Sequence, residues 1–215
     1  MARITTQRTT SMGFAASAAV ALMLTAAMAP GARAQEVDCR QCHQALANQK
    51  TVHPPLSAGC VMCHSAIDAT VIPHGMTGAV ARGLPAESPV LCQLCHDRTA
   101  FEGKFTHVPV AAGMCLSCHD PHSSDQPKLL KMQPAALCLQ CHQGIKSKPH
   151  VLAGFAGAGH PLGDRKKGLI VADPLRPDRE FYCGSCHEPH RSEFTRLLRL
   201  DPDTPTGTCM QCHKF

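Results

Sequence analysis

The chain has 215 residues and a formal net charge of +5, from 21 lysines and arginines against 16 acidic residues. The basic residues are scattered rather than clustered, which argues against nucleic-acid binding. No tryptophan, one tyrosine and seven phenylalanines are present. Side chains alone therefore make a poor hydrophobic core for a domain of this size.

Residues 1–34 have the order of a secretory signal peptide. Arg3 and Arg8 precede an apolar stretch rich in Ala and Leu, and an Ala-Arg-Ala sequence at residues 32–34 follows it. We predict cleavage after Ala34; a retained anchor is the alternative, but the apolar stretch is short for a membrane span. No later stretch is long enough to cross a bilayer. The mature chain is therefore predicted to lack an integral membrane segment and to reside in the periplasm; association with the outer membrane and an extracellular location are the alternatives.

The rest of the chain is organised around a five-residue motif, Cys-x-x-Cys-His, which occurs seven times and uses all fourteen cysteines. Its spacing is that of c-type haem attachment, in which two thiols form thioether bonds to one porphyrin and the histidine binds the iron. Disulfides do not require the adjacent histidine. Zinc sites combine two Cys pairs, or a pair with two spaced histidines, without this contiguous motif. The sequence therefore predicts seven covalently bound haem c groups.

The residues of these motifs are the first predicted site residues. The predicted thioether residues are Cys39, Cys42, Cys60, Cys63, Cys92, Cys95, Cys115, Cys118, Cys138, Cys141, Cys183, Cys186, Cys209 and Cys212. The predicted proximal iron ligands are His43, His64, His96, His119, His142, His187 and His213.

Seven further histidines match the seven irons one to one, which predicts two histidine ligands for every iron. The candidate distal ligands are His53, His74, His107, His122, His150, His160 and His190. Methionine is the competing ligand, but Met62 and Met210 lie inside motifs and Met114 adjoins one, so packing suits them better. Two-histidine ligation implies low potentials, because a methionine ligand raises them.

The motifs and spare histidines fall into three divergent two-haem modules, which we name A (about 51–97), B (about 105–152) and C (about 158–215). Each has a leading histidine, a first motif, a Pro-His pair and a second motif. An extra first haem (residues 35–50) and His150 are left over. The sequences KLLKM (128–132) and RLLRL (196–200) both begin 13 residues after the first cysteine of a first motif, Cys115 and Cys183, which marks an internal repeat. Their leucines are expected to pack on a porphyrin, with the cations toward water or propionates.

Seventeen prolines and sixteen glycines predict sparse regular structure. We expect a single mostly irregular domain over residues 35–215, with short α-helices carrying the motifs and little or no β-sheet. The haems are expected to supply most of the apolar interior, so the apoprotein should be largely unfolded. Removing three signal-peptide arginines leaves 18 basic against 16 acidic residues, and haem propionates should make the holoprotein acidic.

Residues 143–182 form the longest interval without a motif. Residues 169–171 (Leu-Ile-Val) predict a short strand. The interval is open to three interpretations: a surface loop or hairpin, a docking element for a partner, or a segment that delivers His150 and His160 to irons.

The sequences CLSCHDPH…CLQCH and CGSCHEPH…CMQCH resemble the multihaem c-type cytochromes that carry a doubled CXXCH motif. The resemblance is specific over residues 107–142 and 183–213 and looser over 39–96. It implies a haem-wrapped fold, two-histidine irons, and distal ligation by its Pro-His element, matched by His122 and His190. It also implies electron transfer between a quinol-oxidising membrane complex and a terminal reductase, an outer-membrane cytochrome or an extracellular acceptor. The extra first haem and the interval 143–182 depart from a simple array.

These observations predict an electron carrier rather than an enzyme. One alternative is a cytochrome subunit of a larger membrane complex or filament, which has the same chemistry and different partners. The other is a multihaem reductase with one open iron. That would need a substrate pocket and positioned acids or bases, for which the chain is short.

Overall fold

The computed structural model describes residues 37–146, 150, 160, 171–204 and 207–213. The chain divides into two parts, residues 1–36 and 37–215, and every described residue belongs to the second. The predicted signal peptide, residues 1–34, lies outside the described residues. So do residues 169 and 170 of the predicted strand.

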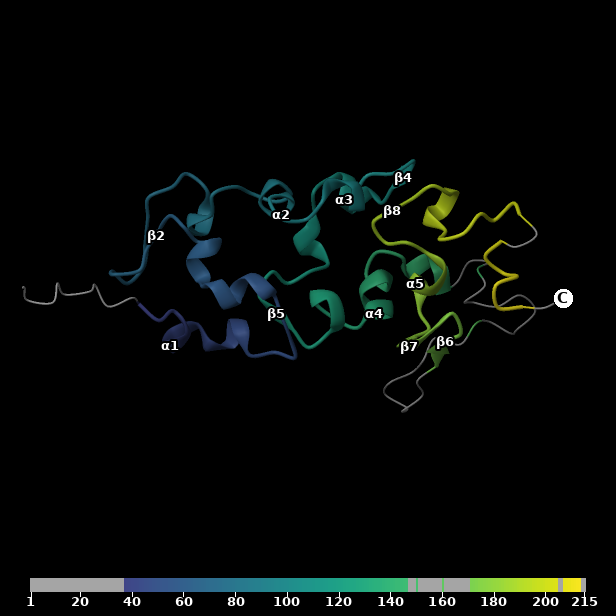
Figure 1. The fold of residues 1–215 in the computed structure, drawn as a ribbon, viewed down its shortest axis with the longest axis horizontal. Coiled ribbons are helices and arrows are strands. Elements are labelled where there is room, and N and C mark those ends of the chain that lie inside the picture. Colours follow the sequence, from purple (N-terminus) through teal and green to yellow (C-terminus); the bar gives the residue numbers. More distant parts are fainter. Residues whose placement is uncertain (1–36, 147–149, 151–159, 161–170, 205–206, 214–215) are drawn as a thin grey trace, which may run out of the picture. The chain divides into compact units, whose positions relative to one another are not determined.

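Short helices and strands joined by turns and loops make up the described part (Figure 1). The α-helices there are α1 (Arg40–His43), α2 (Val90–Gln93), α3 (Val108–Ala111), α4 (Pro134–Leu139) and α5 (Cys183–Cys186). The strands there are β1 (Thr51–Val52), β2 (Ile67–Asp68), β3 (Gly75–Met76), β4 (Phe105–Thr106), β5 (Ser123–Ser124), β6 (Ala172–Asp173), β7 (Arg176–Glu180) and β8 (Arg191–Ser192). The prediction of a mostly irregular fold with short α-helices is confirmed.

The strands pair into small antiparallel sheets of two strands each. Two of these sheets are local, β2 with β3 and β6 with β7. The other two join distant parts of the chain: β1 pairs with β5, with Thr51 opposite Ser124, and β4 pairs with β8, with Phe105 opposite Ser192. Figure 1 shows β4 beside β8. Each long-range pair connects the start of one predicted module to the middle of the next.

All seven CxxCH motifs close the same helical turn. In each, the histidine N–H donates to the carbonyl of the first cysteine, at distances from 2.9 to 3.1 Å. A turn of this kind places residues i, i+3 and i+4 on one face. Both thiols and the imidazole of a motif therefore point to the same side. The longest of the described helices, α4, also has an N-terminal cap, because the Gln133 side chain accepts the Ala136 N–H at 2.9 Å and Pro134 occupies its first position.

Side chains of the described residues build almost no hydrophobic core. Ala135 is the one hydrophobic residue among them that is buried. The other buried side chains of the described residues are polar, those of Ser123, Ser124, Asp173 and Ser192. No helix in this part of the chain has the length and apolar character needed to cross a membrane. The polypeptide alone thus lacks the interior that normally stabilises a domain of this size.

Three backbone turns enter the left-handed region at a basic residue. Arg82, Lys128 and Arg196 have φ of 63°, 58° and 57°. The following residue is also left-handed in each case, and in module A it is Gly83, with φ of 63°. A Cβ on Gly83 would lie 2.6 Å from Ile67 Cγ1 and 2.7 Å from the Ala66 carbonyl carbon. Leucines occupy this left-handed position in the other two turns, so it is the close approach of residues 66–67 that requires glycine here.

Replacing Gly83 with alanine should lower the free energy of unfolding by about 1–3 kcal/mol, because the left-handed conformation and a backbone contact both oppose a side chain. Guanidinium unfolding of the holoprotein, followed by its Soret absorbance, measures the change. Gly75→Ala is the control, since a Cβ there makes an ordinary contact of 3.4 Å with Asp68 Cβ. Equal stability of the two variants would contradict this account of the turn.

Candidate functional site

The imidazole rings of the fourteen histidines lie in seven pairs, and each pair joins one motif histidine to one spare histidine. The ring centroids are 5.6 to 6.2 Å apart. The pairs are His43 with His74, His53 with His96, His64 with His122, His107 with His142, His119 with His190, His150 with His187, and His160 with His213. Every candidate distal histidine therefore faces a candidate proximal histidine.

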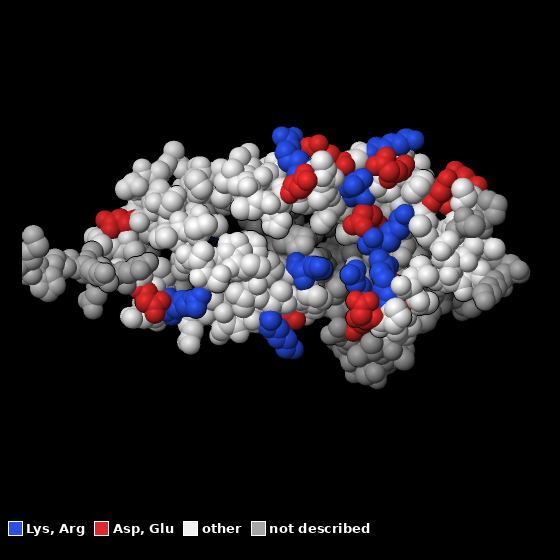
Figure 2. All heavy atoms as spheres, viewed as in Figure 1, with Lys and Arg blue, Asp and Glu red and all other residues white. Residues whose placement is uncertain are grey.

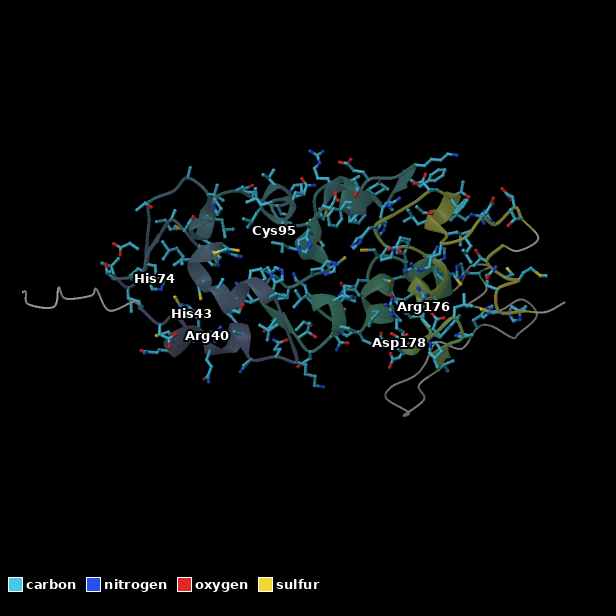
Figure 3. All side chains as sticks on the ribbon, viewed as in Figure 1. Arg40, His43, His74, Cys95, Arg176 and Asp178 are labelled. Carbon is cyan, nitrogen blue, oxygen red and sulfur yellow. The ribbon has the colours of Figure 1, made fainter. Side chains whose placement is uncertain are left out.

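This spacing is the one that a shared iron requires. Imidazole nitrogens bind transition metals at about 2 Å, so two imidazoles on opposite sides of one iron have ring centroids about 6 Å apart. Rings in direct stacking contact would lie closer. In Figure 3, His43 and His74 approach each other from α1 and from the loop that precedes β3. The shortest centroid separation, 5.6 Å, is that of His160 and His213, whose Nε2 atoms are 3.3 Å apart. An iron between them requires about 4 Å, so these two rings would separate slightly.

The histidines of the three first motifs, which are candidate proximal ligands, are oriented by backbone carbonyls. Nδ1 of His64 lies 2.8 Å from the carbonyl oxygen of Arg82. The equivalent distances are 2.9 Å from His119 to Lys128 and 2.7 Å from His187 to Arg196. A carbonyl only accepts, so Nδ1 carries the proton and Nε2 presents its lone pair, the form in which histidine binds a metal. The acceptors are the three left-handed basic residues.

Three of the spare histidines are oriented in the same way. Nδ1 of His53 donates to the Pro121 carbonyl at 2.9 Å, and Nδ1 of His107 donates to the Pro189 carbonyl at 3.0 Å. Nδ1 of His74 donates to the Val71 carbonyl at 2.9 Å. Six of the seven pairs thus contain a histidine whose Nε2 is fixed as the free nitrogen. This donor set fits haem iron.

The Pro-His histidines of modules B and C are kept neutral by their surroundings. Burial lowers the pKa of His122, and the Asp120 carboxylate, 3.6 Å from its Nδ1, opposes this only in part. Burial also lowers the pKa of His190, which has the edge of Phe101 against its ring. Neutral imidazole is the ligand form, so both residues are prepared to bind iron without first losing a proton.

Cysteines of neighbouring motifs lie close together. Burial and the adjacent Cys60 thiol raise the pKa of Cys39, and burial and Cys115 do the same for Cys92. A hydrogen bond with Cys183, with burial, raises the pKa of Cys138. Burial and nearby thiols also raise the pKa of Cys118, beside Cys141, and of Cys186, beside Cys212. Haems attached to consecutive motifs that share such contacts would therefore lie near one another.

A buried ion pair attaches the hairpin β6–β7 to the first motif of module C. The Asp173 carboxylate is 2 % exposed and accepts hydrogen bonds from Arg176 at 2.7 Å and from the Leu175 N–H at 2.9 Å. Burial would raise the pKa of Asp173, but these hydrogen bonds and one from Ser185 lower it overall. Arg176 also donates to the Gly184 and Ser185 carbonyls. The C-terminal end of the interval 143–182 is therefore a hairpin that Arg176 attaches to the motif by hydrogen bonds.

Charged side chains of both signs are interspersed on the face shown in Figure 2, mainly over β4, β8 and α5. Arg98 pairs with Glu102 at 2.9 Å, Arg191 pairs with Glu193 at 3.1 Å, and Arg199 pairs with Glu188. Few charges lie over α1, β2 and α2 on this face. These ion pairs place three arginines next to acidic residues, so charges of the two signs are mixed on this part of the face.

Two features of the site were not predicted from the sequence. The first is the carbonyl acceptor role of KLLKM and RLLRL. The second is that module A contains the same turn, at residues 82–84 (Arg-Gly-Leu). Its signal is weak, because glycine replaces the second residue and the turn begins eight residues after its Pro-His pair rather than six.

One family model matches the chain: the doubled CXXCH motif, over residues 107–147 and 176–215. A search of curated proteins found no match. The matched segments hold both motifs of module B and both motifs of module C. With the Cys-x-x-Cys-His turns described above, the match supports a multihaem c-type cytochrome that takes part in electron transfer and binds haem c covalently.

Proposed function

We propose that the protein is an exported, periplasmic electron carrier that holds seven haem c groups, each iron bound by two histidines. The observation that carries this proposal is the pairing of all fourteen histidines, one motif histidine with one spare histidine, at centroid separations near 6 Å. The proximal and distal ligands are those of the seven pairs. When bound, haem c supplies a reversible one-electron centre.

The contacts between motifs support a relay along the chain. Thiols approach each other between the first and second motifs, and at each step from the third motif to the seventh. The second motif is linked to the fourth instead, because His122, which faces His64, lies three residues after His119. No motif is isolated from the others by these criteria.

The histidine pairs also favour a carrier over a reductase. An enzyme that reduces a bound substrate at iron needs one open coordination position. Each described motif histidine faces a second imidazole, and backbone carbonyls orient three of these second imidazoles, those of His53, His74 and His107. The expected partners are redox proteins: a quinol-oxidising membrane complex as donor, and a terminal reductase or outer-membrane cytochrome as acceptor.

Reductive titration under carbon monoxide tests this function. The holoprotein should take up seven electrons per chain, and the reduced spectrum should be unchanged by carbon monoxide, which binds only open ferrous irons. A mass that accounts for fewer than seven haems would contradict the haem count. Electron uptake below seven per chain by a protein with seven haems would contradict the carrier function. A carbon monoxide complex would show an open iron and favour the reductase alternative.

A further inference from the structure

The two interfaces between modules share one set of backbone and histidine contacts. At the A–B interface, the backbone N–H of His53 donates to the His122 carbonyl at 2.8 Å. At the B–C interface, the N–H of His107 donates to the His190 carbonyl at 3.0 Å. The strand before each leading histidine pairs with the strand after the Pro-His pair of the following module. The leading histidine also donates from Nδ1 to the proline carbonyl of that pair.

The histidine pairs follow the same rule. The first-motif histidine of module A faces the Pro-His histidine of module B, His64 with His122, at 6.1 Å. The first-motif histidine of module B faces that of module C, His119 with His190, at 5.9 Å. By contrast, the leading histidine of each module faces the second motif of its own module. Each module thus completes its own second motif and receives a histidine for its first motif from a neighbour.

The segments that cross the two interfaces also have the same internal structure. Ser124 and Ser192 each bond the carbonyl of the residue six positions later, Leu130 and Leu198. Each serine oxygen accepts an N–H two residues later at 2.9 Å. Both segments then enter the left-handed turn that orients the proximal histidine of their own module. They are therefore two copies of one binding element, Pro-His-x-Ser followed by a fixed turn.

At the two ends of the series of modules, histidines from outside the repeating pattern complete the histidine pairs. The Pro-His histidine of module A, His74, has no preceding module, and the extra first motif supplies His43 at 6.0 Å. The first motif of module C has no following module, and His150 lies 6.2 Å from His187. The strand after His74, β3, pairs with β2 of its own module. By contrast, β5 and β8 each pair with a strand of the preceding module. The extra first motif and His150 thereby supply the second imidazole that the first and last modules lack.

We propose that in modules A and B the face formed by the first motif and the leading strand is a general binding site for a Pro-His-x-Ser segment, so that modules B and C are interchangeable as its partners. This rests on the proposed two-histidine irons. The partner that fits the face of module A is thus the corresponding segment of module C as well as that of module B. Both segments offer the same imidazole, the same carbonyl acceptors and the same short strand.

Within the four residues Pro-His-x-Ser, the two segments differ at one position, Ser123 against Arg191. Ser123 is 2 % exposed and donates to the Leu46 carbonyl at 2.8 Å. Its counterpart Arg191 passes over Gly103, where an added Cβ would lie 2.8 Å from Arg191 Cδ. The residue in the place of Gly103, four positions before the leading histidine of module A, is Gln49 of the segment that holds the extra first motif. The change Arg191→Ser therefore removes the one difference within the Pro-His-x-Ser segment and the one that Gly103 accommodates in module B.

Excision of module B tests the proposal. A chain lacking residues 97–142 and carrying Arg191→Ser joins two equivalent positions, directly after His96 and directly before Gln143. It should attach five haems by mass and give only low-spin ferric signals in electron paramagnetic resonance (EPR), because His190 then completes the iron on His64. Adding His190→Ala to the excised chain should open one iron in five. A high-spin iron in the excised chain before that change would overturn the proposal.

A full-length variant guards against failure of the excised chain to fold. Exchanging residues 124–132 with residues 192–200 keeps the chain length, the composition and both Pro-His pairs. Seven low-spin irons are expected; loss of a haem or a high-spin signal would contradict interchangeability. The parent chain is measured in the same series. A high-spin iron in the parent would contradict the histidine pairs themselves, whereas a low-spin parent with failed variants would contradict only the interchange of modules.

Discussion

Replacing His122 with alanine is expected to open one iron of the seven, and that iron is the one bound by His64. His122 lies only three residues after His119, but its ring faces His64 at 6.1 Å with an interplanar angle of 2°. His119 faces His190 instead. The substitution should therefore leave the haem of its own motif six-coordinate and affect a haem attached about sixty residues earlier (122 minus 64).

The measurement is EPR of the oxidised variant, which should show one high-spin iron per chain. Removing the haem of the second motif, by Cys60→Ala with Cys63→Ala, should abolish that signal in the His122→Ala background. If the high-spin signal survives this removal, His122 serves another iron and the assignment of the pair is wrong. His122→Met should instead raise the potential of the same haem, since axial ligands set haem potentials over a range of about 0.8 V.

Production of the chain without haem attachment is expected to abolish folding. Among the described residues Ala135 is the one buried hydrophobic residue, and the strands pair in sheets of two, which are marginal alone. The histidine pairs that connect the modules have no attraction for each other without iron. The free energy of haem binding is therefore also the free energy of folding.

Circular dichroism and hydrogen exchange of the chain made without haem-attachment machinery measure this effect. Amide protection should be lost throughout, and no cooperative thermal transition should remain. The matched comparison is a variant that lacks one haem, Cys115→Ala with Cys118→Ala, which should retain six haems and a cooperative transition. A haem-free chain that unfolds cooperatively would contradict the view that haem forms the interior.

The local structure could be predicted from the sequence because it is encoded within a few residues. The CxxCH motif fixes its own helical turn, and the scarcity of large apolar side chains, with many prolines and glycines, predicts short elements. The module pattern could also be predicted, since leading histidine, motif and Pro-His pair recur in order. The turn at Arg82 was missed because its spacing and its second residue differ from the other two copies.

The assignment of partners could not be predicted, because it depends on contacts between distant segments. Nothing near His122 in the sequence indicates that it faces His64 rather than the other motif histidines. That choice follows from the pairing of β1 with β5, which brings the Pro-His pair of module B against the leading strand of module A. The hairpin at residues 172–180 likewise depends on a buried ion pair, Asp173 with Arg176, beside a later motif.

Low-temperature EPR of the air-oxidised full-length holoprotein, confirmed by mass to carry seven haems, tests the central claim most directly. The seven histidine pairs predict low-spin ferric signals alone, because each iron then has two imidazole ligands. A substantial high-spin signal would show that at least one pair does not share an iron, and would contradict the account of this protein as an electron carrier with saturated haem coordination.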